Sequence, residues 1–469
     1  MKRNEFIRAS ALAAGAIPMI GNAKLSYGRH QNMCGFSAPP LEKIRVGIIG
    51  LGMRGTSAVE RLSKIRDVEI IALCDLRPEQ VAKSQKTLAK AGRNPAKSFS
   101  GTEEIWKDLV ALDLDLVYIV TPWRWHTPMA IYAMKNGKHA TTEVPTCPTL
   151  KEAWDLVDTS EKTGKHFMML ENCCYDFFEL QTLNMVRQGV FGELTHAEGS
   201  YIHNLCELIT NEKGDSAYQG QWRLQQNIGQ TGNLYPTHGL GPISQCLNIN
   251  RGNQYDHLVS MSTQEASFTE WAKEHGKTKY DHYKNYRGDM NTTLIKCANG
   301  QTIMIHHDVS TPRPYSRIHM LQGTKGIARK YPTPQIALAD HGHGHKWLKS
   351  EEMKELEKKY EHPLARTIGK IARKVGGHGG MDFIMDYRLI YCLKNGLPLD
   401  QNVYDAAAWS CIIPLSLQSV ARGSEPVDIP DFTRGRWKTN APLGIVDVDP
   451  AKLPLFDIKS IKDNTNGAI

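Results

Sequence analysis

The chain has 469 residues, of which 41% are hydrophobic and 23% are charged. These fractions are ordinary for a globular protein and exclude a disordered, collagen-like or coiled-coil chain. The net charge of +8 is spread out without a dense basic run, which disfavours a nucleic-acid partner. No stretch of the sequence reaches the roughly 18 apolar residues that a membrane span needs.

The first 23 residues resemble an export signal. Lys2 and Arg3 precede a short apolar run over 11–20, and Ala23 is a candidate cleavage site. The order from Lys2 to Ile7 is similar to a twin-arginine signal in which lysine replaces one arginine. We therefore expect an exported, periplasmic protein; the alternative is a disordered basic leader. Residues 24–41 have the composition of a linker.

Ten cysteines are scattered along the chain without a Cys-x-x-Cys pair. In a chain of this length they indicate buried free thiols rather than a disulfide framework. Export of a protein that has already folded in the cytosol would reconcile free thiols with an export signal.

Strands and helices alternate after the linker. Short β-branched runs predict strands over 43–49, 68–73 and 114–120. The spacing of apolar residues predicts the intervening helices, over 56–64, 78–91, 127–136 and 151–163. This alternation predicts an α/β fold that begins with a Rossmann domain, a doubly wound parallel sheet, over 42–170.

The pattern changes after about residue 190. Strand-like runs over 292–296 and 302–307 flank Asn299-Gly300, which is a strong hairpin signal, and a second hairpin is expected around 318–327. Helices are expected over 381–394 and 405–421. We expect an α+β domain over 171–440 with an open, largely antiparallel sheet, followed by a tail over 441–469 along the surface.

A glycine motif joins the first strand to the first helix. Gly50, Gly52 and Gly55 form a Gly-x-Gly-x-x-Gly sequence in the strand-to-helix context that dinucleotide binding requires. They allow the tight turn, the approach of the pyrophosphate and close packing of helix on strand. Asp75 ends the second strand, where a carboxylate binds the ribose hydroxyls and favours NAD over NADP, although Arg77 is close by. The alternative is a glycine turn that binds no nucleotide.

Polar and aromatic side chains follow the later strands. They form the segment 121–126, Glu143-Val144-Pro145 and Glu171-Asn172. Each segment alone is more typical of a structural loop. At successive strand ends, however, they lie where a doubly wound sheet binds its ligand, and we expect them near the nicotinamide.

At this point the chain resembles a known superfamily. Residues 43–170 are similar to the cofactor domain of the glucose–fructose oxidoreductase and inositol dehydrogenase (Gfo/Idh/MocA) superfamily, through Thr121-Pro122 with His126 and through Glu143-Val144-Pro145. That superfamily has Glu-Lys-Pro at the second place, and its lysine normally takes part in catalysis. Val144 therefore puts an ordinary dehydrogenase activity in doubt.

Longer strings resemble glycoside hydrolase family 109, the NAD-dependent α-N-acetylgalactosaminidases. They are the strings that begin at Glu171, Gly232, Pro312 and Gly377. The resemblance covers roughly 43–440 and implies hydrolysis with retention. It implies that NAD oxidises the sugar at C3, that elimination across C2 expels the glycosidic group, and that water addition and re-reduction complete the cycle. Such enzymes are recognised exceptions to the two-carboxylate rule.

The resemblance also implies the roles of individual residues. Tyr235 and His238 would be catalytic, because the chemistry needs proton transfer rather than a nucleophile, and the two steps stay unassigned between them. Tyr175 is a further candidate for the active site, and His378 could have a structural or a substrate-loop role, beside an Asp382 that could cap a helix. Substrate contacts are expected from Tyr201, Arg223, Tyr235, His238 and Tyr315. Cofactor contacts are expected from Gly50, Gly52, Met53, Arg54, Gly55, Asp75, Trp123, Arg124, Trp125, His126, Glu143, Val144 and Asn172.

Other functions stay open at this stage. One alternative is an NAD-dependent sugar oxidoreductase with net hydride transfer, and another is an NAD-binding sensor or assembly protein. The alternating histidines over 341–345 do not converge by spacing alone, so we expect no metal site. The expected partner is a small-molecule glycoside or glycan. A homo-oligomer through the open sheet is compatible with the superfamily, although no sequence pattern establishes one.

Overall fold

The computed structural model describes residues 30–212, 218–281, 286–453 and 455. The predicted export signal and the last part of the predicted tail lie outside the described residues. Within the described ranges, no helix combines the length and the hydropathy of a membrane-crossing segment. The described residues from Gln31 onward form one compact unit that contains two sheets.

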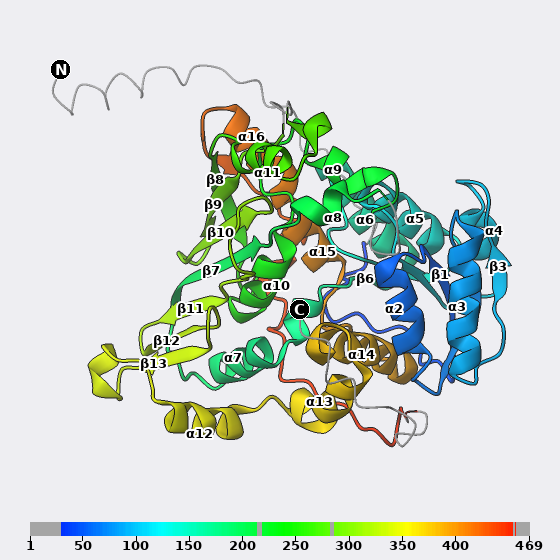
Figure 1. The fold of residues 1–469 in the computed structure, drawn as a ribbon. Coiled ribbons are helices and arrows are strands. Elements are labelled where there is room, and N and C mark those ends of the chain that lie inside the picture. Colours follow the sequence, from blue (N-terminus) through cyan, green and yellow to red (C-terminus); the bar gives the residue numbers. More distant parts are fainter. Residues whose placement is uncertain (1–29, 213–217, 282–285, 454, 456–469) are drawn as a thin grey trace, which may run out of the picture. The chain divides into compact units, whose positions relative to one another are not determined.

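The first sheet has six strands in the order β3-β2-β1-β4-β5-β6, and all of its pairs are parallel. The predicted doubly wound sheet is therefore confirmed (Figure 1). Its strands are β1 (Ile44–Ile49), β2 (Val68–Cys74), β3 (Lys97–Phe99), β4 (Leu116–Ile119), β5 (His139–Thr142) and β6 (Phe167–Met169). Its helices are α2 (Met53–Leu62), α3 (Pro78–Lys90), α4 (Trp106–Val110), α5 (Trp123–Lys135) and α6 (Leu150–Thr163).

Two of these helices begin earlier than the sequence predicted. Helix α2 begins at Met53 directly after Gly52, so the glycine motif runs into its first turn. Helix α5 begins at Trp123 after Pro122, whose extended backbone serves as the N-cap. As a result, residues 123–126 form the first helical turn at the end of β4 rather than a loop.

The second sheet has eight strands in the order β13-β12-β11-β7-β10-β9-β8-β14. Among the described strands of this second sheet, only the pair of β7 and β10 is parallel, so the sheet is largely antiparallel, as expected. The turn at Asn299-Gly300 joins β9 to β10, and both predicted hairpins are confirmed. The strands are β7 (Leu194–Ile202), β8 (Tyr255–Ser262), β9 (Met290–Cys297), β10 (Thr302–Asp308), β11 (Met320–Gly323), β12 (Gly326–Arg329), β13 (Gln335–Leu338) and β14 (Val427–Asp428).

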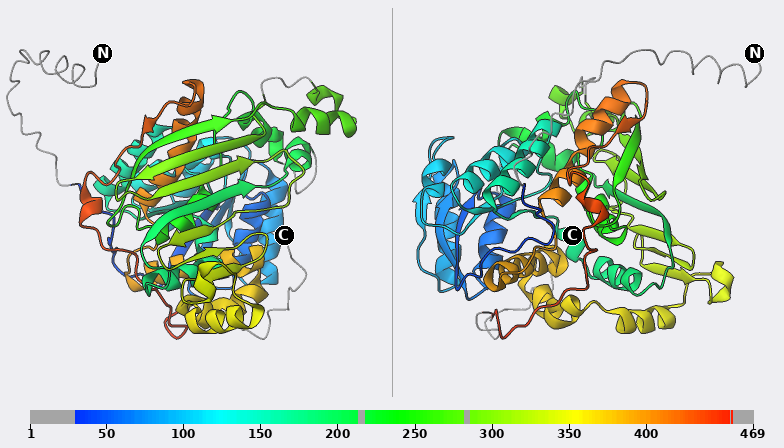
Figure 2. Two further views of the ribbon diagram at one scale, coloured as in Figure 1. Left: turned by 90° about the vertical axis from the view of Figure 1, so that its left-hand side faces the viewer. Right: turned by 180° about the vertical axis from the view of Figure 1, so that it is seen from behind.

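One face of this sheet is open, and its central strands lie toward the viewer on the left of Figure 2. The helices gather mainly behind it, on the side of the first sheet. They are α7 (Phe177–Arg187), α8 (Cys206–Thr210), α9 (Trp222–Gln226), α10 (Thr237–Cys246), α11 (Ser267–Glu274), α12 (Ser350–Tyr360), α13 (Pro363–Val375), α14 (Met381–Asn395), α15 (Val403–Ser410) and α16 (Ile412–Ala421).

The single helix predicted over 405–421 is in fact two helices, α15 and α16. Pro414 lies in the first turn of α16 and has no backbone N–H to bond the carbonyl of Ser410. The helix therefore breaks around Cys411, which is the C-cap of α15 and the N-cap of α16.

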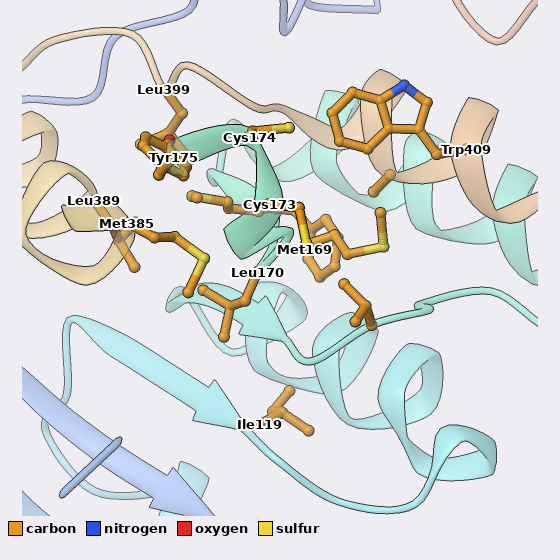
Figure 3. Close-up of a cluster of buried hydrophobic side chains, with 14 of the residues drawn as sticks. Ile119, Met169, Leu170, Cys173, Cys174, Tyr175, Met385, Leu389, Leu399 and Trp409 are labelled. Carbon is orange, nitrogen blue, oxygen red and sulfur yellow. The ribbon is translucent and has the colours of Figure 1, made fainter. Parts of the chain in front are cut away.

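The two sheets are joined by a shared hydrophobic core. A short 3-10 helix after β6, η1 (Asn172–Tyr175), brings Cys173, Cys174 and Tyr175 against Met385 and Leu389 of α14 and Trp409 of α15 (Figure 3). All ten cysteines have free thiols and nine are buried, which confirms the prediction. The first sheet and the second sheet therefore pack as one body.

Candidate functional site

A cavity of about 810 Å³ lies at the carboxyl ends of the parallel strands, where a doubly wound sheet binds its ligands. Its wall combines the glycine turn after β1 with residues of β7, α9, α10 and the loop before α14. All the predicted cofactor residues except Gly55 line it, and so do all the predicted substrate residues except Tyr315.

The glycine turn is shaped for a phosphate group. A Cβ on Gly50, where φ is +90°, would lie 2.5 Å from the carbonyl oxygen of Val120, and a Cβ on Gly55 would lie 1.9 Å from the oxygen of Gly50. At Gly52, by contrast, the nearest atom is Arg77 Nη2 at 3.9 Å. The first turn of α2 has neither a side-chain cap nor an acidic residue. Open space beside uncapped N–H groups at a helix start fits the pyrophosphate of a dinucleotide.

Asp75 holds this turn in place. One carboxylate oxygen accepts the N–H of Leu51 at 2.7 Å, and the other accepts the backbone N–H of Arg77 at 2.9 Å. Arg77 Nε also contacts this second oxygen at 3.2 Å, so Asp75 engages the cation that could have favoured a 2′-phosphate. The carboxylate thus stands at the β2 end where ribose hydroxyls are bound, as predicted, with a structural role as well.

A second carboxylate network surrounds Arg54 in the first turn of α2. Arg54 Nε donates to Glu143 Oε1 at 2.9 Å, and Nη1 donates to Asp382 Oδ2 at 2.6 Å. Asn172 Nδ2 donates to the other oxygen of Asp382 at 2.5 Å. Burial opposes ionisation of Asp382, but Arg54 and Arg61 hold its pKa well below the ordinary value. The predicted helix cap at Asp382 is therefore wrong: the N-cap of α14 is Gly380, and the carboxylate binds Arg54 instead.

The side chains in the first turn of α5 differ in their burial. Trp123 and His126 are buried, Trp125 is half-buried, and Arg124 is exposed beside Glu103 at 3.4 Å. Both nitrogens of His126 lie 2.7 Å from backbone carbonyl oxygens, those of Pro145 and Thr121. His126 therefore joins the ends of β4 and β5, which leaves its ring nitrogens engaged by the backbone.

The wall opposite the glycine turn is aromatic. The rings of Tyr201 and Tyr235 lie 4.5 Å apart, and that of His238 lies 5.0 Å from Tyr235 and 5.5 Å from Tyr201. Tyr235 also lies 5.7 Å from Trp123 of the cofactor side. Tyr315 is half-buried beside this group, 6.4 Å from Tyr201. The structure therefore brings the predicted substrate residues from β7, α10 and the 312–315 loop together.

Arg223 lies among these rings as a buried cation. Its guanidinium carbon is 4.8 Å from the ring centre of Tyr235, 5.8 Å from that of Tyr201 and 5.4 Å from that of Trp123. Its Nη1 donates to the hydroxyl of Tyr218 at 2.7 Å. Burial raises the pKa of Tyr235 well above its ordinary value, and the Arg223 cation opposes this only in part. Tyr235 is therefore a phenol that can donate a hydrogen bond at neutral pH.

His238 is paired with a buried carboxylate. Its Nδ1 lies 2.8 Å and 3.0 Å from the two oxygens of Glu171, which can only accept, so Nδ1 carries the proton and Nε2 is free to accept one. Burial works against ionised Glu171, but His238 and the backbone N–H of Cys173 lower its pKa below the ordinary value. A carboxylate that orients a histidine in this way is typical of acid–base catalysis.

Several sequence-based assignments change. Tyr175 is not in the cavity: it is buried in the core cluster of Figure 3, where its hydroxyl donates to Asp400 at 3.3 Å. Glu171 was expected near the nicotinamide, and its pairing with His238 was not foreseen. Its position at a strand end was the available signal. Tyr218, Trp222 and His203 also line the cavity, and no sequence pattern pointed to them.

Comparisons with known proteins agree with this geometry. Residues 44–171 match the oxidoreductase family with an NAD-binding Rossmann fold, and residues 175–439 match the C-terminal domain of glycosyl hydrolase 109. A family 109 protein of Porphyromonas gingivalis is 51% identical over 85% of this chain and 86% of its own length. An α-N-acetylgalactosaminidase of Bacteroides fragilis is 49% identical over 87% of this chain and 96% of its own length.

Among solved structures, a levoglucosan dehydrogenase with NADH and levoglucosan aligns with a TM-score of 0.62 at 17% identity, over 83% of this chain and all of the other. At this identity the likeness shows the fold alone. The match over 175–439, the relatives that are half identical, and the dinucleotide-shaped turn facing a Tyr–His pocket lead to one conclusion: this chain belongs to glycosyl hydrolase family 109, the NAD-dependent glycosidases, and carries their NAD-binding Rossmann fold.

Proposed function

We propose that this glycosidase removes terminal α-linked N-acetylgalactosamine with retention, by oxidation at C3, elimination, addition of water and re-reduction. The name of the B. fragilis relative, which is nearly half identical, supports the sugar. The observation that carries the mechanism is the Glu171–His238 pair: His238 lies with Tyr235 on the wall of the cavity that the glycine turn also lines, and the buried Glu171 holds His238 from behind.

The carboxylates of the cavity argue against ordinary glycosidase chemistry. Retaining and inverting enzymes need two carboxyl groups beside the glycosidic bond. Among the described carboxylates that line this cavity, Glu143 and Asp382 both bind Arg54. A third, Asp75, accepts a hydrogen bond from the glycine turn and holds it in place. The fourth, Glu103, is exposed beside Arg124. None of them forms a free facing pair, and this favours proton transfer by His238 and Tyr235.

The residues around the sugar then have distinct tasks. Bound NAD supplies reversible hydride transfer at C3. His238 accepts a proton through Nε2, and Glu171 stabilises the resulting imidazolium. Tyr235, Tyr201 and Arg223 donate hydrogen bonds to oxygens of the sugar and hold the C3 and C2 positions near His238. Tyr315 lies beside this aromatic group, 6.4 Å from Tyr201, at the edge of the pocket.

The second candidate is a sugar oxidoreductase with net hydride transfer, which the match of residues 44–171 to the oxidoreductase family favours. Val144 weighs against it, because this buried side chain has no amine where the superfamily motif has lysine. The two functions differ in what accumulates: a glycosidase releases aglycone with no net change in the cofactor, whereas an oxidoreductase forms one reduced nicotinamide for each sugar that it oxidises.

The experiment uses purified protein, an aryl α-N-acetylgalactosaminide and no added cofactor. We expect repeated release of the aryl group and no build-up of reduced nicotinamide. Stoichiometric reduced nicotinamide with the free sugar, and no aryl release, would favour the oxidoreductase. Absence of turnover on α- and β-linked N-acetylhexosaminides would remove the substrate assignment.

Export and self-association remain proposals. The leader over 1–23 supports export of the folded, cofactor-loaded protein, and cell fractionation checks it. The exposed side chains of Met261 and Leu294 on the open face of the second sheet support a dimer through that face. If this is right, Leu294→Glu yields monomers in light-scattering measurements where the wild type yields dimers.

A further inference from the structure

A glycine loop joins α13 to α14 and contributes a single side chain to the cavity. Its residues are 376–380, and all four of its glycines have positive φ. A Cβ on Gly377 would lie 2.7 Å from the Cβ of Asp382, and one on Gly380 would lie 2.7 Å from the backbone of Ala372. Packing against both helices therefore fixes the path of the loop and the place of its one side chain, His378.

His378 lies beside the phosphate-binding turn. Gly377, His378 and Asp382 line the same cavity as Gly52 and Arg54. His378 Nδ1 is 2.9 Å from Asp382 Oδ2 and 3.1 Å from Arg54 Nη1. The carboxylate can only accept and the guanidinium can only donate, so Nδ1 is engaged in either tautomer of the imidazole. The imidazole remains 45% exposed and its Nε2 has no hydrogen-bond partner in the described part of the chain, so Nε2 is available to a ligand.

Asp382 connects this histidine to the predicted cofactor residues. Its fully buried carboxylate accepts from Arg54 and Asn172, and lies 2.9 Å from His378 Nδ1 and 3.5 Å from Arg61. Arg54 and Arg61 belong to α2 and Asn172 to η1, whereas Asp382 belongs to α14. One carboxylate thus contacts side chains from α2, from η1 and from the glycine loop.

Helix α14 is itself fastened to the cofactor side. One turn after Asp382, Asp386 accepts from Arg61 Nε at 2.7 Å and from the hydroxyl of Tyr118 on β4 at 2.8 Å. At its far end, Lys394 pairs with Asp67 at 2.8 Å. The contact of α14 with α2 is visible in Figure 1. The glycine loop is therefore held beside the glycine turn after β1, although more than 300 residues separate the two segments in the sequence.

We propose that residues 376–382 form a cofactor clasp, in which His378 binds NAD directly and Asp382 positions Arg54 and Asn172 to bind it. Release of the dinucleotide then requires the loss of contacts with both halves of the chain. A clasp of this kind suits a cofactor that is restored in every catalytic cycle and does not need to leave. The advantage of retaining the cofactor rests on the proposed function. The contacts proposed to bind NAD do not depend on that function.

The test measures the release of NAD without any sugar. Protein loaded with NAD is passed through a desalting column, and the NAD that remains bound is measured over time after denaturation. We expect His378→Ala to release NAD about tenfold faster, the effect of one lost hydrogen bond of ordinary strength. For Asp382→Asn we expect a larger acceleration, up to about 100-fold, because charge-assisted bonds are stronger.

Two matched controls separate binding from folding. His341 lies next to Gly342, is 47% exposed and also contacts a carboxylate, that of Asp340, but it does not line the cavity. Asp400 is a buried carboxylate that pairs with Arg388 of α14 at 2.9 Å but does not line the cavity. We expect His341→Ala and Asp400→Asn to release NAD at close to the wild-type rate.

The NAD-free form of His378→Ala should melt at the wild-type temperature, because the side chain is half exposed, while NAD raises that temperature by less than it does in the wild type. Release from His378→Ala at the wild-type rate overturns the clasp, whatever Asp382→Asn does. Equal acceleration in both controls also overturns it. A protein that retains NAD in this pattern but hydrolyses no glycoside would contradict the proposed function alone.

Discussion

The two sides of the cavity are built in opposite ways. Where the phosphates and the ribose of the cofactor are expected, the binding surface is mainly backbone: a glycine turn and uncapped N–H groups, with one aspartate at a strand end, all within 50–75. The aromatic wall expected to face the sugar is made of side chains from β7, α9, α10 and the segment just before α10. The difference teaches that a local motif can specify a phosphate-binding turn, whereas a substrate pocket depends on long-range packing.

The largest effect is expected on the sugar side, at His238. Replacing His238 with alanine removes the proton-accepting nitrogen and should lower kcat by about 10²–10⁴-fold, the usual contribution of general acid–base catalysis. The variant should retain NAD like the wild type, because His238 is held by Glu171 rather than by the glycine turn. Steady-state kinetics with a measurement of bound NAD check this. A variant that loses both together would show that the two sides are not separate.

On the cofactor side, Gly52→Val is the corresponding change. Its added atoms point into open space, with only Arg77 within 4 Å, so the fold should tolerate them while the pyrophosphate cannot approach. We expect NAD affinity to fall about 30-fold, or about 2 kcal/mol, as for other overpacked sites, with little change in melting temperature. Gly55→Ala is the contrasting variant, because its Cβ would collide with the backbone of Gly50 and destabilise the protein.

Glu171→Gln tests the pair through pH. The pKa of Glu171 is depressed in the folded protein, so the stability that its carboxylate contributes is present above the unfolded value of about 4.3 and is lost as the pH falls through the folded pKa. At neutral pH we expect the variant to be less stable by about 1.5–3 kcal/mol, the worth of a hydrogen bond to a charged group. Denaturant unfolding at several pH values measures the difference, which should shrink toward acid.

Tyr315→Phe should have the smallest effect. The Tyr315 hydroxyl accepts from Arg317 Nη1 at 3.2 Å, and its ring is half-buried at the edge of the pocket. Loss of one neutral hydrogen bond to the substrate is worth about 0.5–1.5 kcal/mol, which corresponds to a rise in KM of about 2–12-fold. NAD affinity should not change, and a change would place Tyr315 on the cofactor side.

The sequence predicted what depends on neighbours in the chain. The order of strands and helices, the glycine turn and the position of Asp75 all rest on short-range patterns, and the structure has them where they were expected. The segment 121–126 after β4 was predicted as a loop, whereas Pro122 is the N-cap of α5 and the helix begins at Trp123.

What the sequence could not predict depends on contacts between distant segments. Glu171 and His238 are 67 residues apart, and Asp382 lies 328 residues from Arg54. Tyr175 belongs to the family-like string that begins at Glu171, which made it a candidate for the active site. Its ring instead points into the core between Leu389 and Leu399 (Figure 3). The spacing of apolar residues in a sequence does not indicate which side chains of a turn face a cavity.

The central claim is that the glycosidic bond is broken by elimination, and one measurement tests it most directly. The purified protein hydrolyses an aryl α-N-acetylgalactosaminide in heavy water, and the released sugar is analysed by proton NMR. The account predicts deuterium at C2 in the product, because the proton lost from C2 is replaced from solvent. Released N-acetylgalactosamine that keeps its C2 proton in full would contradict the account.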